Sequence, residues 1–247
     1  MIRPSTSALV GRALRRVAQR EKAAVLSRFF KTGPGEYGAG DKFLGVVVPQ
    51  QRRVAREFRD LPLPELSKLL RSPWHEERLT SLLILVDQHS RGDLLLKNRL
   101  HHFYLSHSKY VNNWDLVDLT AYFLIGPHVD PDRPKRLERL AGSPQVWERR
   151  MAIVSTFYFI KKGIPGPTLL IADRLVGDRH DLIHKAVGWM LREVGKRCSV
   201  RVEREFLDRQ AAGMPRTMLR YAIERFPERL RQRYLLQGKD DSMRIRR

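Results

Sequence analysis

Apolar residues recur along this chain at intervals of three and four positions, the spacing that places them on one face of an α-helix. The longer runs of this kind begin near Trp74, Asn112, Val146, Asp181 and Met214, roughly 33 to 38 residues apart. A shorter helical run precedes each of them, at residues 63–71, 93–107, 134–141, 167–176 and 200–210. The pattern therefore predicts pairs of helices that repeat along the chain.

Proline and glycine separate these runs. They fall at residues 72–73, 126–127, 143–144, 163–167, 177–178 and 213–215. Helix pairs of this period with breakers between them are typical of α-solenoids built from HEAT-like repeats. We therefore predict an all-α fold, an α-α superhelix in which the second helices line a concave basic groove. The repeats share period and punctuation rather than residue identities.

The predicted repeats occupy residues 61–236 of what we expect to be a single structural domain. Before them, residues 1–60 are predicted to form an N-terminal helical cap with a glycine-rich loop at residues 32–41. This loop lacks the spacing of a nucleotide-binding glycine motif, and one strand-like run follows it at residues 43–48. The basic residues 237–247 are predicted to be a disordered C-terminal tail.

The first 20 residues allow two interpretations. They are rich in arginine and contain no acidic residue before Glu21, which is typical of a transit peptide. The spacing of Leu9, Leu14 and Val17, continued by Leu26, also fits an amphipathic first helix. We expect the helix, because no change of composition separates this segment from the rest of the chain.

The net charge of the chain indicates which class of binding partner to expect. The 247 residues include 47 lysines and arginines against 27 acidic residues, a formal net charge of +20 that is spread through the whole chain. Such an excess favours nucleic acid, and after it an anionic membrane surface, over a basic surface that serves only solubility. The candidate phosphate contacts, which could equally be solvated charges, are Lys31, Lys42, Arg52, Arg53, Arg149, Lys161, Lys162 and Lys185.

Several classes of site lack support in the sequence. The single cysteine, Cys198, excludes an intramolecular disulfide and a multi-thiolate metal site, and it suits a reducing compartment. Neither HExxH nor GxSxG occurs, and no apolar run reaches about 18 residues. We expect no metal, no cofactor and no membrane partner, and a cytoplasmic monomer.

Three segments combine aromatic and charged residues inside otherwise apolar helices, at residues 111–118, 147–153 and 185–193. Trp114 and Asp118 lie one helical turn apart on one face, with Asn112 or Asn113 as the helix N-cap and Asp115 expected to face solvent. A carboxylate beside an indole can stabilise a cation that forms during a reaction. A core tryptophan and an exposed acid are the structural alternative.

The other two segments also carry candidate side chains. Arg150 lies early in a largely buried helix, where arginine pairs with a carboxylate or grips phosphate, whereas Arg149 is expected to face solvent. Trp189 follows Gly188, which permits close approach by another group. Trp189 could equally be a core aromatic residue.

In combination, these segments resemble the AlkD-type DNA alkylation repair glycosylases, which are built from HEAT-like helix pairs. The resemblance rests on Trp-x-x-x-Asp at Trp114 and Asp118, on residues 147–153 and 185–193, and on an N-terminal segment at residues 28–46. It extends from about residue 23 to about residue 226.

The resemblance implies excision of cationic N3- and N7-alkylated purines from double-stranded DNA without metal or cofactor, by a protein associated with the nucleoid when bound. By position, it implies that Asp118 is the catalytic carboxylate, that Trp114 and Trp189 flank the deoxyribose, and that Arg150 holds a backbone phosphate. An alkylated purine is already an activated leaving group, so one carboxylate suffices where ordinary glycosidases use two.

An N-terminal aromatic residue is expected to complete this site. Phe29 or Phe30 occupies the approximate position, and Tyr37 is the alternative.

Two other functions remain open at this stage: a non-catalytic protein that binds DNA structures, and a protein-binding α-solenoid scaffold. The first gives Asp118 no role, and the second explains neither the net charge nor the concentration of tryptophan and aspartate. An RNA-binding repeat protein is less well supported, since no paired side chains of a base code recur.

Overall fold

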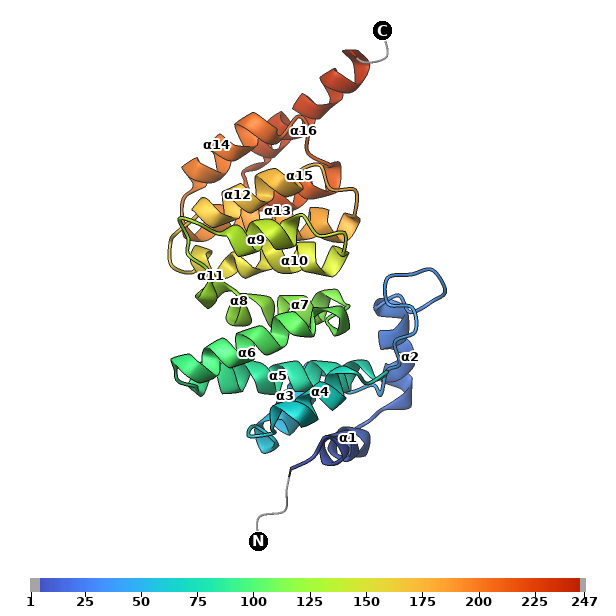
Figure 1. Cartoon of the computed structure of the whole chain (residues 1–247). Helices are drawn as coiled ribbons and strands as arrows, with labels where there is room; N and C mark the ends of the chain where they lie inside the picture. Colours follow the sequence, from blue (N-terminus) through green and yellow to red (C-terminus); the bar gives the residue numbers. More distant parts are fainter. Residues whose placement is uncertain (1–4, 245–247) are drawn as a thin grey trace. The chain divides into compact units, whose positions relative to one another are not determined.

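The computed structural model describes the backbone of residues 5–244 and the side chains of residues 5–236. In this part of the chain the regular elements are α-helices and short 3-10 helices, together with an isolated bridge between Lys42 and Trp74. The all-α prediction is therefore confirmed. The chain divides into two compact units, Met1–Leu124 and Ile125–Arg247, and the division falls inside the predicted run of repeats (Figure 1).

Unit 1, Met1–Leu124, is built around one long buried helix, α5. Its elements are α1 (Ser7–Arg16), α2 (Arg20–Phe29), α3 (Val48–Glu57), α4 (Leu63–Leu70), α5 (His75–Arg91), α6 (Leu94–Ser106), the 3-10 helix Ser108–Tyr110, α7 (Trp114–Asp118) and α8 (Ala121–Leu124). Helix α5 is buried continuously from His75 to Leu85, because α1, α3, α4, α6 and α8 all pack against it. Its polar residues in this stretch must therefore find partners inside the protein.

The N-terminal helix that we predicted is interrupted. Helix α1 ends at Arg16 and α2 begins at Arg20. Between them, the N–H of Gln19 donates to the carbonyl of Leu44 at 3.1 Å. A hydrogen bond to a distant segment thus replaces a helical one, and no local sequence pattern reports it.

The strand-like run at residues 43–48 does not form a strand. The N–H groups of Leu44, Gly45 and Val46 all donate to the buried carboxylate of Glu76, at 2.8 to 3.2 Å. Gly45 has φ 81°, and a Cβ there would lie 2.0 Å from the carbonyl oxygen of Gln19. The anion draws the three N–H groups to one point, which an extended strand cannot do because its N–H groups alternate in direction.

The two units share a helix-start arrangement that is built from serine, glutamate and arginine residues at the same spacing. Before α5, Ser72 Oγ accepts from the N–H of Trp74 (3.1 Å) and donates to Glu77 (2.6 Å), while Arg78 donates to the Ser72 carbonyl (3.0 Å). The corresponding residues in unit 2 are Ser143, Gln145, Glu148 and Arg149. They make the same three bonds, at 3.1, 2.6 and 3.0 Å. Each unit therefore fixes the segment that leads into α5 or α10 with the same three hydrogen bonds.

Unit 2, Ile125–Arg247, carries the helix pairs that the periodicity predicted. Its elements are the 3-10 helix Gly126–His128, α9 (Lys135–Ala141), α10 (Val146–Ser155), α11 (Phe157–Ile160), α12 (Gly166–Leu175), α13 (Asp181–Arg197), α14 (Val200–Gln210), α15 (Arg216–Ala222), the 3-10 helix Ile223–Arg225 and α16 (Glu228–Arg244). Helix α13 packs against α10, α12, α14 and α15. At Gly188 a Cβ would lie 2.4 Å from the Met218 carbonyl oxygen, so the glycine permits the close approach of α13 and α15.

Two predicted helices are broken by threonine, and one extends further than predicted. Helix α7 gives way to α8 at Thr120, and α10 to α11 at Thr156. Both hydroxyls donate to a backbone carbonyl of the preceding turn, which competes with regular helical bonding. Helix α16 continues to Arg244 through much of the predicted tail at residues 237–247, and residues 245–247 lie outside the described residues.

Candidate functional site

Helix α7 carries two of the predicted site residues in unit 1. Asn113 is its N-cap, and the Asn113 side chain accepts a hydrogen bond from the N–H of Trp114 at 2.8 Å. Trp114 and Asp118 are half-buried, and both line a cavity of about 430 Å³. The prediction that these two side chains share one face is therefore confirmed.

Two aromatic side chains from the end of α2 lie against Trp114. The Phe30 ring is buried and stacks on the indole at a centroid distance of 5.2 Å, while the Phe29 ring meets it edge-to-face at 5.8 Å. Phe29 is 61% exposed, and both phenylalanines belong to the cavity lining, which does not include Tyr37. Of the three aromatic candidates, the structure thus brings Phe29 and Phe30 to Trp114.

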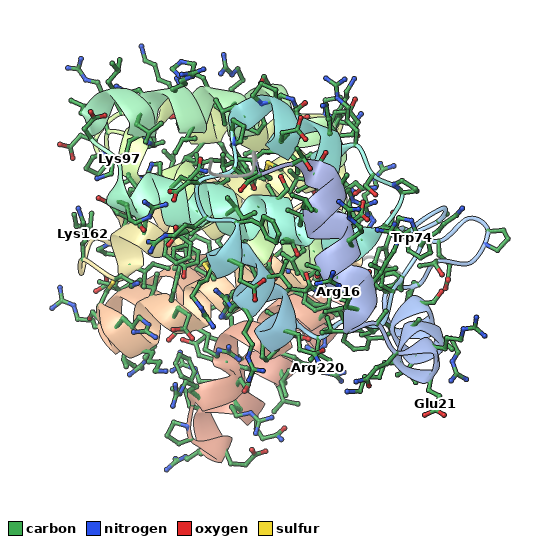
Figure 2. All side chains as sticks on the ribbon, turned by 90° about the horizontal axis from the view of Figure 1, so that it is seen from below. Arg16, Glu21, Trp74, Lys97, Lys162 and Arg220 are labelled. Carbon is green, nitrogen blue, oxygen red and sulfur yellow. The ribbon has the colours of Figure 1, made fainter. Side chains whose placement is uncertain are left out.

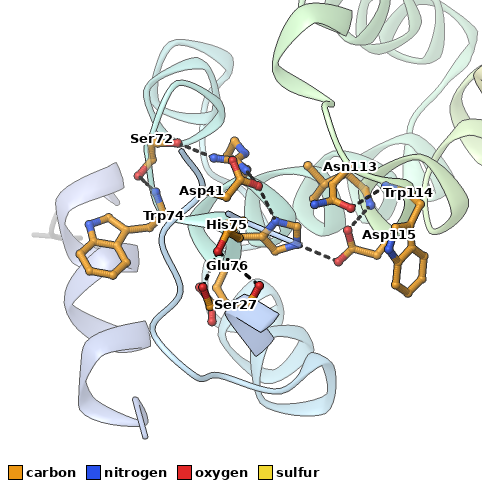
Figure 3. Close-up of polar contacts among 12 residues, drawn as sticks. Ser27, Asp41, Ser72, Trp74, His75, Glu76, Asn113, Trp114 and Asp115 are labelled. Carbon is orange, nitrogen blue, oxygen red and sulfur yellow. Dashed lines mark hydrogen bonds and ion pairs between the residues drawn. The ribbon is translucent and has the colours of Figure 1, made fainter. Parts of the chain in front are cut away.

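Asp115 does not face solvent as we expected. It is buried, and its carboxylate accepts a hydrogen bond from His75 Nε2 at 2.8 Å (Figure 3). Because α7 is short and begins against α5, its first turn points a carboxylate inward, where the imidazole is the partner that makes burial of the charge tolerable.

A buried chain of alternating charges continues from this pair. His75 Nδ1 lies 3.3 Å from Asp41 Oδ2 (Figure 3). Arg78 Nη2 donates to the same oxygen at 2.5 Å. Burial alone would lower the pKa of His75, but the Asp115 carboxylate and the hydrogen bonds to Asp115 and Asp41 raise it to about 9. Although burial opposes it, the hydrogen bond from His75 and the charge of Arg78 lower the pKa of Asp41. The imidazole is therefore positively charged at neutral pH and donates from both nitrogens.

This chain of charges ties the glycine-rich loop, α5 and α7 together beside the cavity. Neither it nor the role of Glu76 was predicted from the sequence. The signal that could have revealed them is the run His75-Glu76-Glu77-Arg78, four ionisable residues at the start of a helix that is otherwise apolar.

In unit 2, Arg150 is a buried residue of α10, only 5% exposed, and its Nη1 donates to the carbonyl of Leu182 at 2.5 Å. Leu182 lies in the first turn of α13, so Arg150 holds the beginning of that helix. Arg149 does not face solvent as we expected. Its Nε lies 2.6 Å from Asp178 Oδ2, and its Nη1 donates to two carbonyls of the preceding turn.

Trp189 lies on α13 and is half-buried. Its ring centroid is 6.2 Å from that of Phe157. Trp189 is partly exposed, unlike nearby apolar residues such as Val187 and Met190, which are fully buried. An indole face that is accessible in this way can contact a ligand.

A sequence model of the family described as "DNA alkylation repair enzyme" matches residues 10–226 of this chain. The chain belongs to this family. A solved structure described as a predicted DNA alkylation repair enzyme from Enterococcus faecalis is similar in fold, with a TM-score of 0.66 over 85% of this chain and 97% of that chain, at 16% sequence identity. No curated protein matches the chain. The resemblance that we drew from the sequence is therefore confirmed, and alkylation repair is the role of the family.

In this member of the DNA alkylation repair family, most predicted phosphate contacts are exposed. Those that lie at the surface are Lys31, Lys42, Arg52, Arg53, Lys161 and Lys162. Lys185 instead is half-buried and forms an ion pair with Asp181 at 2.6 Å. Figure 2 shows further basic side chains pointing outward, among them Arg16 on α1 and Arg220 on α15.

The described residues contain no group of three or more histidine, cysteine or carboxylate side chains that could hold a metal ion. Among the same residues, no helix has the length and apolar character needed to cross a membrane.

Proposed function

We propose that the chain is a DNA glycosylase that releases cationic N3- and N7-alkylated purines from double-stranded DNA. The observation that carries this proposal is the pair formed by Trp114 and Asp118, which reach one cavity from the same face of α7 beside the exposed Phe29. A carboxylate framed by aromatic rings suits a sugar that becomes positively charged as the glycosidic bond breaks.

In this mechanism the alkylated base leaves with the electrons of the C1′–N bond. Because the lesion already carries a positive charge, the base departs neutral and needs no proton from an acid. Asp118 stabilises the oxocarbenium-like deoxyribose electrostatically. Water then adds at C1′ and releases its extra proton to solvent. Trp114 and Trp189, which belong to different units, are assigned to the two sides of this sugar by resemblance.

Arg150 is assigned to a backbone phosphate by the same resemblance. Its bond to the Leu182 carbonyl supports a second contribution, which is to hold the first turn of α13, the helix that carries Trp189. The net charge of +20 and the exposed lysines and arginines support duplex DNA as the partner. We further propose that the protein acts as a monomer in the cytoplasm, on the nucleoid, without a cofactor.

The deciding experiment incubates the purified protein with duplexes that contain N7-methylguanine or N3-methyladenine, and measures free base by mass spectrometry. We expect release by the wild type and slow release by Asp118→Asn. Asp132→Asn, which changes an exposed aspartate of unit 2, is the matched control and should behave as wild type. Tight DNA binding without any base release would instead identify a non-catalytic DNA-binding protein.

A further inference from the structure

His75 lies among aromatic rings as well as among charges. Its side chain is 2% exposed, and the imidazole centroid lies 4.7 Å from that of Phe43 and 4.9 Å from that of Phe30. The Phe30 ring in turn stacks on the Trp114 indole, with 21° between the two planes. Phe30 therefore contacts both the buried imidazole and the indole that borders the candidate site.

A second connection from His75 runs through α7. One oxygen of Asp115 accepts a hydrogen bond from His75 Nε2, and the other accepts from the N–H of Leu116 at 2.8 Å. Helix α7 has only five residues, and a helix of this length is not stable without tertiary contacts. Its orientation therefore depends on what holds its first turn. The directions of Trp114 and Asp118 depend on the same anchor.

The hydrogen bonds of His75 require the protonated ring. Asp115 accepts from Nε2, and Asp41 of the glycine-rich loop lies 3.3 Å from Nδ1 (Figure 3). A neutral imidazole has a single N–H, so its other nitrogen would turn a lone pair toward a carboxylate. Among the described residues, the charged groups that face His75 are these two carboxylates and Arg78 of the same helix. The end of α2 contributes the uncharged ring of Phe30.

We propose that His75 is a positioning residue for base release. Its protonated imidazole holds Asp115 and Phe30, and through them it orients the Asp118 carboxylate and the Trp114 indole. Because the imidazole is buried, it acts through these neighbours and not on the DNA itself. This inference rests on the proposed function, since the orientation matters for base release only if Asp118 and Trp114 take part in it.

The first test follows Trp114 in the free protein, labelled with fluorotryptophan. Although burial opposes it, the charge of Asp115 and the hydrogen bonds to both aspartates raise the pKa of His75 to about 9. We expect the fluorine resonance of Trp114, assigned with Trp114→Phe, to shift with the same midpoint as the His75 ring protons. Trp147 on α10 is the matched control and should not follow His75. A Trp114 resonance that stays unchanged while His75 titrates would overturn the proposal.

The second test removes the imidazole and supplies it again from solution. His75→Gly should slow single-turnover base release by about 10- to 100-fold per folded protein, because a misplacement of about 1 Å can cost that much. Affinity for duplex DNA should stay at the wild-type level, since phosphate contacts dominate it. Added imidazole, which can carry the charge, should restore more of the rate than pyrazole, a ring of the same size that is uncharged at neutral pH.

His89→Gly is the matched control for this second test. It removes another buried histidine of α5, outside the lining of the cavity beside Trp114. Neither ring should alter the rate of base release by this variant. If imidazole restores no more of the rate of His75→Gly than pyrazole does, the role assigned to the charge is overturned.

Phe30→Leu keeps the proposal falsifiable should His75→Gly fail to fold. The change retains apolar volume and leaves the ion pair with Asp115 intact, but it removes the ring between His75 and Trp114. Base release should slow, and the Trp114 resonance should no longer follow His75. Wild-type release by this variant would overturn the path through Phe30.

The positioning role and the proposed function can fail separately. A Trp114 resonance that follows His75 in a protein that releases no base would contradict the proposed function alone. Base release by a protein whose Trp114 resonance ignores His75 would contradict the positioning role alone.

Discussion

His75 and Asp115 form a buried ion pair, with His75 Nε2 2.8 Å from Asp115 Oδ2 and both side chains more than nine-tenths buried. The pair joins the first residue of α5 to the second residue of α7, the helix that presents Trp114 and Asp118. The position of the candidate site in unit 1 therefore depends on charge pairing as well as on apolar packing.

Removing one member of this pair should destabilise the protein strongly. His75→Gln or Asp115→Asn alone leaves an uncompensated buried charge, which costs about 3–5 kcal/mol. The double variant should cost clearly less than the sum of the two, and denaturant unfolding of all four proteins gives the coupling energy. Strict additivity of the two single changes would show that the pair does not act as a unit.

Alkaline pH should destabilise the protein through a second buried group, Glu203 on α14. This residue is 2% exposed, and its carboxyl lies where a Cβ on Gly195 would be, 1.7 Å from Oε2. Burial, only partly offset by the charge of Arg192, raises the pKa of Glu203 to about 8. Since the folded pKa exceeds the unfolded one, the stabilising effect is complete below about pH 4.5 and is lost as pH rises through 8.

The check compares wild type with Glu203→Gln, which keeps the shape of the neutral acid. The variant should match wild type at pH 5 and exceed it at pH 9 by an amount on the order of 2–5 kcal/mol. Glu205 lies on the same helix but is exposed, and Glu205→Gln should therefore show no such pH-dependent difference in stability from wild type. Parallel pH profiles for wild type and Glu203→Gln would contradict the prediction.

Asp118→Asn should separate binding from chemistry. The change removes a negative charge near the DNA backbone, so duplex affinity should stay the same or improve slightly. It also removes the charge that stabilises the sugar cation, and base release should slow by about 10- to 1000-fold. Single-turnover excision and duplex affinity on one preparation provide the measurement, and full activity would make Asp118 a solvated surface acid.

If the proposed function holds, affinity for duplex DNA should fall steeply with salt and depend little on sequence, because phosphate contacts made by exposed lysines and arginines carry no base code. With six or more phosphate contacts, raising salt from 50 to 200 mM should weaken binding by about 10³-fold or more. A flat response to salt would favour a protein partner over nucleic acid.

Local sequence pattern predicted the helix pairs well, since period and breakers are properties of neighbouring residues. It also placed Trp114 and Asp118 on one face, because both lie within a single turn of α7. It failed where a distant partner decides the outcome. Glu76 converts a strand-like run into an anion-binding loop, and His75 draws Asp115 inward. Chain positions far apart in sequence supply those partners, so periodicity cannot report them.

Arg150→Ala and Trp189→Ala give the most discriminating test of the predicted residues in unit 2. If Arg150 grips phosphate, its loss should weaken binding to all duplexes and reduce the salt slope by about one unit. If it only holds Leu182 at the start of α13, the variant should lose thermal stability while its folded fraction keeps the wild-type salt slope. Arg149 lies on the same helix as Arg150, and Arg149→Ala removes its ion pair with Asp178. This variant is the matched control for a structural arginine.

Trp189→Ala separates a role in the site from a role in packing in the same way. A contact with the lesion's sugar predicts slower excision with little change in affinity for undamaged DNA. A purely structural tryptophan predicts a loss of about 3–5 kcal/mol, the cost of truncating a core aromatic residue. Because Trp189 is only half-buried, we expect a smaller loss of stability together with a clear loss of rate. The two roles are distinguished by measuring melting temperature, duplex affinity and excision rate on one preparation. Normal excision by the folded fraction would show that Trp189 is not part of the site.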